Sequence, residues 1–271
     1  MIFVRDKGRM CNNILQYAHV YAWGREHGRS TLSMRFAYKY HYFRICDSRH
    51  HHFLAYLVGK FGAKWGLLPV IGFHDPQADP APLEAAMLRH RHVVVEGWWV
   101  PWHNLVLKYK QEIVGLFAFN EQVAVPVDAQ LAALPQGALR LGVHVRRGDY
   151  RTWHDGKYYF TDEQYCACIR QFLSLHADRP VQVFVCGNDP ELDKDFFRRE
   201  LSSATVMFPE GNPGEDLYLL SCCHYLIGAP STFTLIASMY HDVPLYWIQD
   251  ANVPLTEAAF GHFDELFQHT L

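Results

Sequence analysis

The second half of the chain alternates short apolar runs with segments of helical character, and this pattern constrains the fold more than any other feature. The candidate strands cover residues 139–145, 181–186, 205–208, 225–227 and 244–248. The candidate helices between and after them cover residues 161–176, 190–201, 214–223 and 231–240. Strands joined through helices pair in parallel, because a parallel connection needs a long crossover. The pattern therefore predicts an α/β fold with a doubly wound parallel sheet.

The first half shows the same order of elements less clearly. Ile2–Val4 is a candidate strand, a Gly-containing loop follows, and a helix begins near Asn12 and ends at Gly28. A strand that leads through a loop to a helix N-terminus suits an anion such as a sugar diphosphate. Asn12 and Asn13 are therefore candidate donor-binding residues, although a plain β-α unit explains the pattern equally well. The Pro135–Gly137 turn predicts a boundary between domains 1–136 and 137–271.

Two stretches of the first half combine basic and apolar residues. Residues 35–44 interleave arginine and lysine with aromatic residues, which indicates either an acceptor or membrane-surface patch, or a loop whose aromatic side chains fold inward. Residues 53–68 are apolar with Lys60 and Lys64 one turn apart. That segment is either a helix that lies on a membrane surface or a half-buried core helix.

The strand at residues 139–145 ends in a charged cluster. Leu141, Val143 and Val145 alternate with other residues at the period of a strand, and Arg146-Arg147-Gly148-Asp149 follows. Adjacent guanidinium groups repel each other unless an anion lies between them, and their planar forks suit phosphate oxygens. His144 shares a strand face with Arg146 and points to the same edge. A surface Arg–Asp ion pair is the structural alternative.

Three strand ends of the second half carry polar residues that meet at one edge of a parallel sheet. They are Arg146-Arg147-Gly148-Asp149, Gly187-Asn188-Asp189 and Ser231-Thr232. Ser231 and Thr232 offer hydroxyls and backbone N–H groups at a helix N-terminus, which is a seat for phosphate. Asn188, Asp189 and Asp216 are candidate acceptors of hydrogen bonds from a ligand at this edge.

Group transfer from a phosphorylated ligand to a hydroxyl needs a stabilised leaving group and a base near the acceptor hydroxyl. Arg146 is the candidate for stabilising the leaving group. Asp149, His154 and Asp155 are candidates for the base, and a solvated loop is the alternative for His154 and Asp155. No metal site is predicted. Asp193-Lys194-Asp195 resembles a metal-binding triplet, but it lies in the predicted first turns of a helix, where acidic residues are favoured by the helix dipole alone.

Composition excludes several classes of protein. The formal net charge of -3 argues against nucleic acid as a partner. The sequence contains no Gly-x-Gly-x-x-Gly and no Walker loop, which disfavours nicotinamide and ATP chemistry. Seven cysteines, an odd number, indicate reduced thiols in a cytosolic protein. We expect neither a signal peptide nor a membrane span, because Met1 leads directly into a strand and Lys60 and Lys64 interrupt the longest apolar stretch.

Three motifs resemble those of the α-1,2-fucosyltransferases, and more loosely those of the wider α-1,2/α-1,6/protein-O-fucosyltransferase superfamily. The first is His144-Val-Arg-Arg-Gly-Asp-Tyr150, which is the most specific. The second, Cys11-Asn12-Asn13-Ile14-Leu15-Gln16-Tyr17-Ala18, is similar to the family's Gly-Asn-Gln-x-Phe-Gln-Tyr-Ala. The third joins Glu215-Asp216-Leu217-Tyr218-Leu219-Leu220-Ser221 to Ser231-Thr232-Phe233-Thr234. The resemblance spans almost the whole chain in matching order.

The chain also departs from the family pattern. Cys11 replaces a glycine and Asn13 a glutamine, Ala229-Pro230 replaces the usual Ala-Asn, and Leu235-Ile236 replaces a Trp-Trp pair. These departures bear on the acceptor and on the exact sugar more than on the nucleotide diphosphate.

The resemblance implies an inverting, metal-independent glycosyltransferase of GT-B type, with two Rossmann-like domains. It implies that the C-terminal half binds GDP-fucose, with Asn188, Asp189 or Asp216 accepting hydrogen bonds from N1 and N2 of guanine. It implies that the N-terminal half binds an oligosaccharide or lipid-linked glycan, with the 2-hydroxyl of a terminal galactose as the acceptor. It further implies a bacterial enzyme of surface-polysaccharide synthesis, in the cytoplasm or in peripheral contact with the inner face of the membrane. The alternatives are another GDP-sugar transferase on the same scaffold and a non-catalytic glycan-binding protein.

Overall fold

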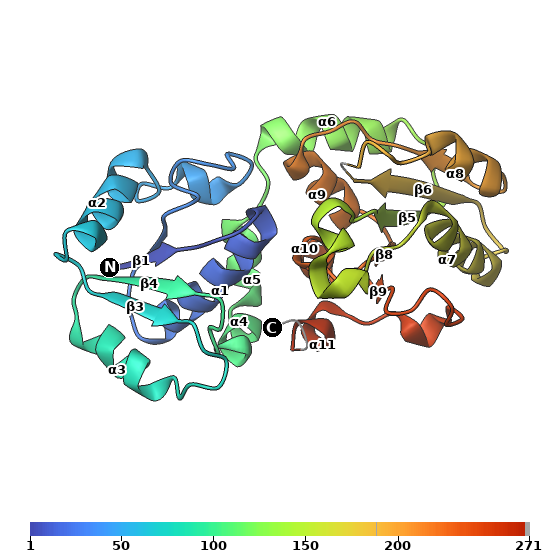
Figure 1. Ribbon diagram of the computed structural model, residues 1–271. Helices are drawn as coiled ribbons and strands as arrows, with labels where there is room; N and C mark the ends of the chain where they lie inside the picture. The colour runs from blue at the N-terminus through green and yellow to red at the C-terminus, as the bar shows by residue number, and fades with distance from the viewer. Residues whose placement is uncertain (188, 269–271) are drawn as a thin grey trace. The chain divides into compact units, whose positions relative to one another are not determined.

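The computed structural model describes residues 1–187 and 189–268 of the chain. These residues form two compact units, Met1–Gln122 and a second unit that begins at Val123. The structure places the boundary after residue 122, which is 14 residues before the predicted boundary at residue 136 (136 − 122). The reason is that α6 (Glu121–Ala132) belongs almost entirely to the second unit. Figure 1 shows the elements of both units.

The first unit contains a four-stranded parallel sheet with the strand order β2-β1-β4-β3. Its strands are β1 (Ile2–Arg5), β2 (Thr31–Ser33), β3 (Val70–Phe73) and β4 (Val93–Gly97). Its helices are α1 (Met10–Glu26), α2 (Phe53–Lys64), α3 (Ala81–Arg89), α4 (His103–Lys108) and α5 (Lys110–Leu116). The first half of the chain therefore has the same parallel α/β architecture as the second.

The second unit contains a five-stranded parallel sheet with the order β7-β6-β5-β8-β9. Its strands are β5 (Leu139–His144), β6 (Val181–Cys186), β7 (Thr205–Met207), β8 (Tyr225–Gly228) and β9 (Leu245–Trp247). Its helices after α6 are α7 (Asp162–Leu175), α8 (Lys194–Glu200), α9 (Pro213–Ser221), α10 (Thr232–His241) and α11 (Phe263–Phe267). Strands and helices alternate as the sequence predicts, and the α/β fold is confirmed.

The central strand β5 is buried on both faces. Leu141 and Val143 belong to a core that includes Ile169 of α7 and Phe197 of α8. On the opposite face, a Cβ atom on Gly142 would lie 2.7 Å from Leu220 of α9. Helices thus cover both faces of the sheet, which explains why the strand has an almost continuous apolar sequence. Burial of each such side chain contributes roughly 1.5–3 kcal/mol to stability.

The observed starts of α7, α8 and α1 can be compared with those predicted from the sequence. Thr161 caps α7, and Gln164 completes a capping box, as the sequence predicts. α8 begins only at Lys194, because Asp193 is its N-cap and accepts hydrogen bonds from two backbone N–H groups. α1 begins at Met10 after its N-cap Arg9, two residues before the start predicted near Asn12 (12 − 10).

The structure shows how the two basic and apolar stretches of the first half, residues 35–44 and 53–68, are folded. In residues 35–44, Phe36 and Phe43 are fully buried, so the aromatic side chains fold inward at these two positions. Residues 53–64 form α2, which packs one face on the sheet. No helix of the described residues is long and apolar enough to cross a membrane. All seven cysteines are free thiols.

Candidate functional site

The carboxyl ends of four strands lie in register in the second unit. Cys186 of β6, His144 of β5, Gly228 of β8 and Trp247 of β9 are aligned across the sheet. The residues that follow each strand therefore begin at one edge, where ligands bind in open α/β sheets. Tyr150 joins two of these segments, since its hydroxyl donates a hydrogen bond of 2.6 Å to the carbonyl of Pro230.

Arg146 lies at this edge with a single carboxylate beside it. Its Nη2 donates to both carboxylate oxygens of Asp149, at 2.6 and 2.8 Å. Its guanidinium lies 4.9 Å from the ring centroid of Tyr150, and its backbone N–H donates to the hydroxyl of Tyr165. The Asp149 side chain is 54% exposed, so water screens this ion pair. Phosphate binding by Arg146 stays a prediction.

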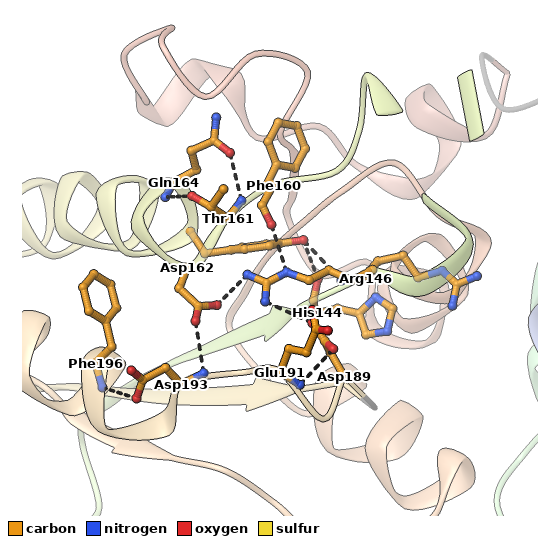
Figure 2. Close-up of polar contacts among 12 residues, drawn as sticks. His144, Arg146, Phe160, Thr161, Asp162, Gln164, Asp189, Glu191, Asp193 and Phe196 are labelled. Atoms are coloured by element: carbon orange, nitrogen blue, oxygen red, sulfur yellow. Dashed lines mark hydrogen bonds and ion pairs between the residues drawn. The ribbon is translucent and has the colours of Figure 1, made fainter. Parts of the chain in front are cut away.

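Arg147 is held quite differently. Its side chain is 5% exposed, its Nε donates to the carbonyl of Phe160, and its two terminal nitrogens donate to Asp162 and Asp189. Figure 2 shows these carboxylates with their other hydrogen bonds. The fork of Arg147 is bound to protein groups, which favours a structural role, and phosphate binding by Arg147 stays a prediction. We call Arg147, Phe160, Asp162 and Asp189 the arginine brace.

Both carboxylate oxygens of Asp189 are bound to protein groups. One oxygen accepts from Arg147 at 3.0 Å, and the other accepts from the backbone N–H of Glu191 at 3.1 Å. Both oxygens thus stabilise the loop after β6, which favours a structural role, and guanine binding by Asp189 stays a prediction. Asn188, the other predicted base-binding residue of this loop, lies outside the described residues.

His144 is buried beneath the same edge. Its ring stacks on Phe233 of α10 with a centroid distance of 4.6 Å and an interplanar angle of 17°. Burial, together with the charge of Arg146, lowers the pKa of His144 to about 3, so the imidazole is neutral at neutral pH. Its Nδ1 is buried and has no hydrogen-bond partner in the described part of the chain. Figure 2 labels His144 and Arg146.

The N-terminus of α10 completes this edge. Ser231 is the N-cap, and its hydroxyl oxygen accepts from the backbone N–H of Thr234 at 3.3 Å. Thr232 is the first helical residue, and Trp247 of β9 donates to the hydroxyl of Thr234 at 2.9 Å. The helix start is therefore fixed to the sheet with its positive end at the edge. Phosphate binding by Ser231 and Thr232 stays a prediction.

A pocket opens beside α9 in the second unit. It is lined by residues of α6, of the stretch 209–211 and of α9, among them Gln130, Gly211 and Asp216. Burial, and to a lesser extent the neighbouring Glu215, raises the pKa of Asp216 to about 7. Oδ1 of Asp216 is buried and has no hydrogen-bond partner among the described residues. An acceptor without a donor in a pocket is an arrangement that a ligand N–H group would complete.

The predicted catalytic carboxylates and histidine lie after β5. Asp149 is bound to Arg146, while His154 and Asp155 lie on an exposed turn where both have positive φ angles, 48° and 54°. His154 packs edge-on against Trp153, with a centroid distance of 4.4 Å. The solvated-loop alternative thus describes His154 and Asp155 in this structure, and no base role is shown for either.

Asn12 and Asn13 lie in α1 of the first unit. Asn13 is fully buried, and its Nδ2 donates to the carbonyl of Gly8 at 3.4 Å. Gln16 donates to the carbonyls of Lys7 and Asn12 and also accepts from the N–H of Lys7. These amides hold the loop after β1, which favours the structural alternative, and donor binding by Asn12 and Asn13 stays a prediction.

Sequence reasoning missed a polar cluster at the carboxyl edge of the first sheet. Asp6 follows β1, is 4% exposed, and accepts from the Ser33 hydroxyl and the Arg35 N–H. Burial raises the pKa of Asp6 to about 7, although both hydrogen bonds oppose the rise. Glu96 of β4 accepts from Arg5 at 3.0 Å. The signal available in the sequence was that Asp6 and Glu96 each stand at the end of a β-prone run.

Comparison with known proteins finds one matching family and several solved structures of similar fold. The model of glycosyl transferase family 11 matches residues 87–242, which is more than half of the chain. No curated protein sequence matches the chain.

Three solved structures share the fold at low sequence identity. FUT1 of Arabidopsis thaliana in complex with GDP is 12% identical with a TM-score of 0.64, over 96% of this chain and 73% of that one. POFUT1 in complex with GDP is 11% identical with a TM-score of 0.58, over 89% and 94%. The α-1,6-fucosyltransferase NodZ from Bradyrhizobium, co-crystallised with GDP, is 15% identical with a TM-score of 0.55, over 91% and 94%.

Proposed function

Because the chain belongs to glycosyl transferase family 11, we propose that it transfers L-fucose from GDP-fucose to the 2-hydroxyl of a terminal galactose on an acceptor glycan, in the two-domain GT-B arrangement. One observation carries the donor assignment. Arg146 stands at the strand edge beside the start of α10 with only a half-exposed carboxylate as its ion-pair partner in the described residues. The solved structures that share this fold include proteins with GDP or GDP-fucose bound.

The diphosphate would lie between Arg146 and the N-terminus of α10. The guanidinium and the helix dipole both favour negative charge at this point. They stabilise GDP as a leaving group without any proton transfer to the phosphate. The buried, neutral His144 lies below this position and contributes no charge of its own.

Guanine would occupy the pocket beside α9. Its N1–H and N2–H donors match a carboxylate acceptor, and Asp216 presents a buried oxygen there that lacks a donor. Guanine binding would favour the ionised form of a carboxyl group whose pKa of about 7 leaves it partly protonated at neutral pH. This assignment selects Asp216 from the three candidates of the sequence.

The reaction would be a single displacement with inversion. The acceptor oxygen forms a bond to C1 of fucose while the bond from C1 to the β-phosphate oxygen breaks, and the hydroxyl proton passes to a carboxylate. Phosphate binding by Arg146 would release Asp149 from its ion pair. Asp149 would then be a proton acceptor close to the reacting centre, and for this reason we prefer it to His154 and Asp155 as the base.

The difference from the family pattern at residues 235 and 236 does not support another donor sugar. Leu235 and Ile236 replace the Trp-Trp pair, but both are fully buried in the described structure. The replacement therefore changes the packing of α10 and not a surface that a sugar would touch. A GDP-sugar other than fucose stays an alternative that the donor assay below decides.

The function is tested with purified full-length chain and a panel of GDP-fucose, GDP-mannose and UDP-galactose. We expect slow GDP release from GDP-fucose alone, and faster release when a galactose-terminated glycan is added, with an α-1,2 linkage in the product by NMR. Release from GDP-mannose alone would establish a different donor. Binding of glycan with no release from any donor would establish a non-catalytic glycan-binding protein.

A further inference from the structure

Helix α2 presents one face to the first sheet and leaves the opposite face uncovered. Ala55, Tyr56 and Ala63 pack on a cluster that contains Phe3 and Met34. Gly59 lies directly on the sheet, since a Cβ atom there would be 2.8 Å from Phe3. The inner face thus uses small residues at helical spacing to approach the strands closely.

The opposite face of α2 and the turn after it are apolar and exposed. The exposed fractions are 55% for Phe53, 68% for Leu54, 59% for Val58, 64% for Trp65 and 73% for Leu67. Leu54, Val58 and Trp65 follow one another at spacings of four and seven residues, which places them on one side of a helix. We call Phe53, Leu54, Val58, Trp65 and Leu67 the α2 apolar face. Large contiguous apolar surfaces of this kind mark interaction sites in soluble domains.

The Lys, Arg, Asp and Glu residues of the segment that carries the α2 apolar face are all basic. Lys60 and Lys64 are exposed on the same helix, and the ammonium group of Lys60 lies 5.5 Å from the ring centroid of Tyr56. Residues 48–74 contain Arg49, Lys60 and Lys64 but no aspartate or glutamate. The nearest acidic residues in the sequence are Asp47 and Asp75. The complementary surface must therefore be apolar with negative charge around it.

A second basic segment adjoins α2. Tyr38 contacts Tyr56 of the helix with a ring-centroid distance of 4.5 Å, and Arg35 donates to the Tyr38 hydroxyl at 2.8 Å. Lys39 is exposed beside it. The basic and aromatic stretch at residues 35–44 thus extends the positive charge beyond α2. Tyrosine and tryptophan rings with lysine beside them are typical of segments at a lipid–water interface.

From this geometry we propose that the α2 apolar face docks on an anionic lipid membrane, with α2 parallel to the bilayer plane. The apolar side chains enter the boundary between headgroups and acyl chains, and Lys60 and Lys64 lie at the level of the phosphates. A helix of 12 residues is too short to span the hydrocarbon core, which needs about 20 residues. The proposal does not depend on which sugar the protein transfers.

A second copy of the chain fits this surface less well. Two-fold interfaces bring the same patch of both subunits together, so Lys60 and Lys64 of one copy would face lysines of the other. Like charges opposed at an interface cost free energy and are avoided in specific complexes. Anionic lipid supplies both the apolar layer and the opposite charge.

Vesicle co-sedimentation tests this surface. We expect the full-length chain to sediment with vesicles of phosphatidylcholine mixed with phosphatidylglycerol, and much less with phosphatidylcholine alone. Lys60→Gln with Lys64→Gln should reduce the partition coefficient on anionic vesicles about fivefold for each lysine. The triple variant Leu54→Ser, Val58→Ser and Trp65→Ser should reduce it at least about tenfold on the same vesicles.

Matched controls separate this surface from general stickiness and from loss of function. Val125→Ser with Val253→Ser removes side chains that are 61% and 54% exposed in the second unit, and it should leave sedimentation unchanged. GDP release from GDP-fucose should be the same in all variants. The proposal is overturned if wild type does not sediment with anionic vesicles, or if the α2 variants sediment as wild type does. It is equally overturned if sedimentation velocity shows a dimer that the triple variant dissociates while vesicle binding is absent.

Discussion

Arg146 and Arg147 are neighbours in sequence but belong to two regions of the second unit with opposite character. Arg146 lies at the open edge of the sheet and pairs with one half-exposed carboxylate. Arg147 lies within the arginine brace and binds two carboxylates whose side chains are 14% and 11% exposed. Successive side chains of an extended segment point to opposite sides, which separates the two guanidinium groups. Residue type and sequence position are thus a poor guide to role, and the surroundings decide it.

The difference in burial gives the two arginines different energetic consequences. A buried charge that loses its partners leaves uncompensated carboxylates in a low dielectric, which is strongly destabilising. The Arg146–Asp149 pair contributes less to stability, because the Asp149 side chain is 54% exposed and water screens the pair. The brace is therefore expected to control stability, and the edge is expected to control ligand binding.

Arg147→Ala should have the largest effect. It leaves Asp162 and Asp189 without their cation, and we expect a loss of about 3–5 kcal/mol in the free energy of unfolding. Urea unfolding followed by circular dichroism measures this loss. Arg147→Lys is the matched control, because it keeps the charge but not the fork, and it should recover part of the loss. Wild-type stability of Arg147→Ala would show that the brace is not structural.

Arg146→Ala should leave stability nearly unchanged and weaken GDP binding. The loss of a charge-assisted contact to phosphate is worth about 2 kcal/mol, or roughly a thirtyfold rise in Kd. Isothermal titration calorimetry with GDP measures the rise, and the melting temperature serves as the control for folding. An Arg146→Ala variant with wild-type affinity for GDP contradicts the donor site.

Asp149→Asn should separate chemistry from donor binding at the edge. The amide cannot accept the hydroxyl proton, so turnover should fall by roughly a hundredfold or more while GDP affinity stays close to that of wild type. Initial rates of transfer, compared with calorimetry on the same preparation, test this. Ordinary turnover would move the base role to His154, Asp155 or a residue of the first unit.

The pKa of Asp216, raised by burial to about 7, should make both stability and binding depend on pH. Its ordinary value is 3.8, so the folded state holds more protons between pH 3.8 and 7. The contribution of this carboxyl to stability is therefore present below pH 3.8 and is lost as pH rises through 7. Asp216→Asn should remove that part of the loss. Asp6 has the same raised pKa and accounts for a separate part, which Asp6→Asn should remove.

GDP affinity should change in the opposite direction, because guanine favours ionised Asp216. We expect affinity at pH 8 to be about tenfold higher than at pH 6. Asp216→Asn should bind GDP weakly, and its affinity should lack this pH dependence. The comparison cancels the titration of the phosphate itself. Equal pH profiles for both proteins would remove Asp216 from the guanine site.

The smallest expected effect is that of EDTA on transfer, which should be none. Arg146 and the start of α10 would neutralise the diphosphate, so a divalent cation would compete with them for the same oxygens. Asp193 of the metal-like triplet caps α8, and Asp193→Ala would also cost about 1 kcal/mol of stability. Asp193→Ser keeps a cap and removes the carboxylate, so it is the cleaner variant. Activity that EDTA removes, that Mn²⁺ restores and that Asp193→Ser lacks would contradict metal independence.

The sequence by itself determined the alternation of strands and helices in the second unit, the capping of α7 and the edge that carries Arg146. These features depend on local periodicity and on capping residues close in the chain, which a sequence displays directly. It placed the start of α1 two residues late (12 − 10), because the N-cap Arg9 makes no side-chain capping hydrogen bond and so does not mark the helix start in the sequence.

Only the tertiary structure decided which polar residues are left to a ligand. Asp189 and Asp216 are both aspartates near one edge of the sheet. Arg147 and the backbone of Glu191 use the oxygens of Asp189, whereas burial beside α9 leaves Oδ1 of Asp216 without a donor in the described chain. Partners that are distant in sequence determine whether a buried polar atom is satisfied. For the same reason, the sequence does not show which side of α2 is exposed. The packing of the opposite side on Phe3 and Met34 determines it.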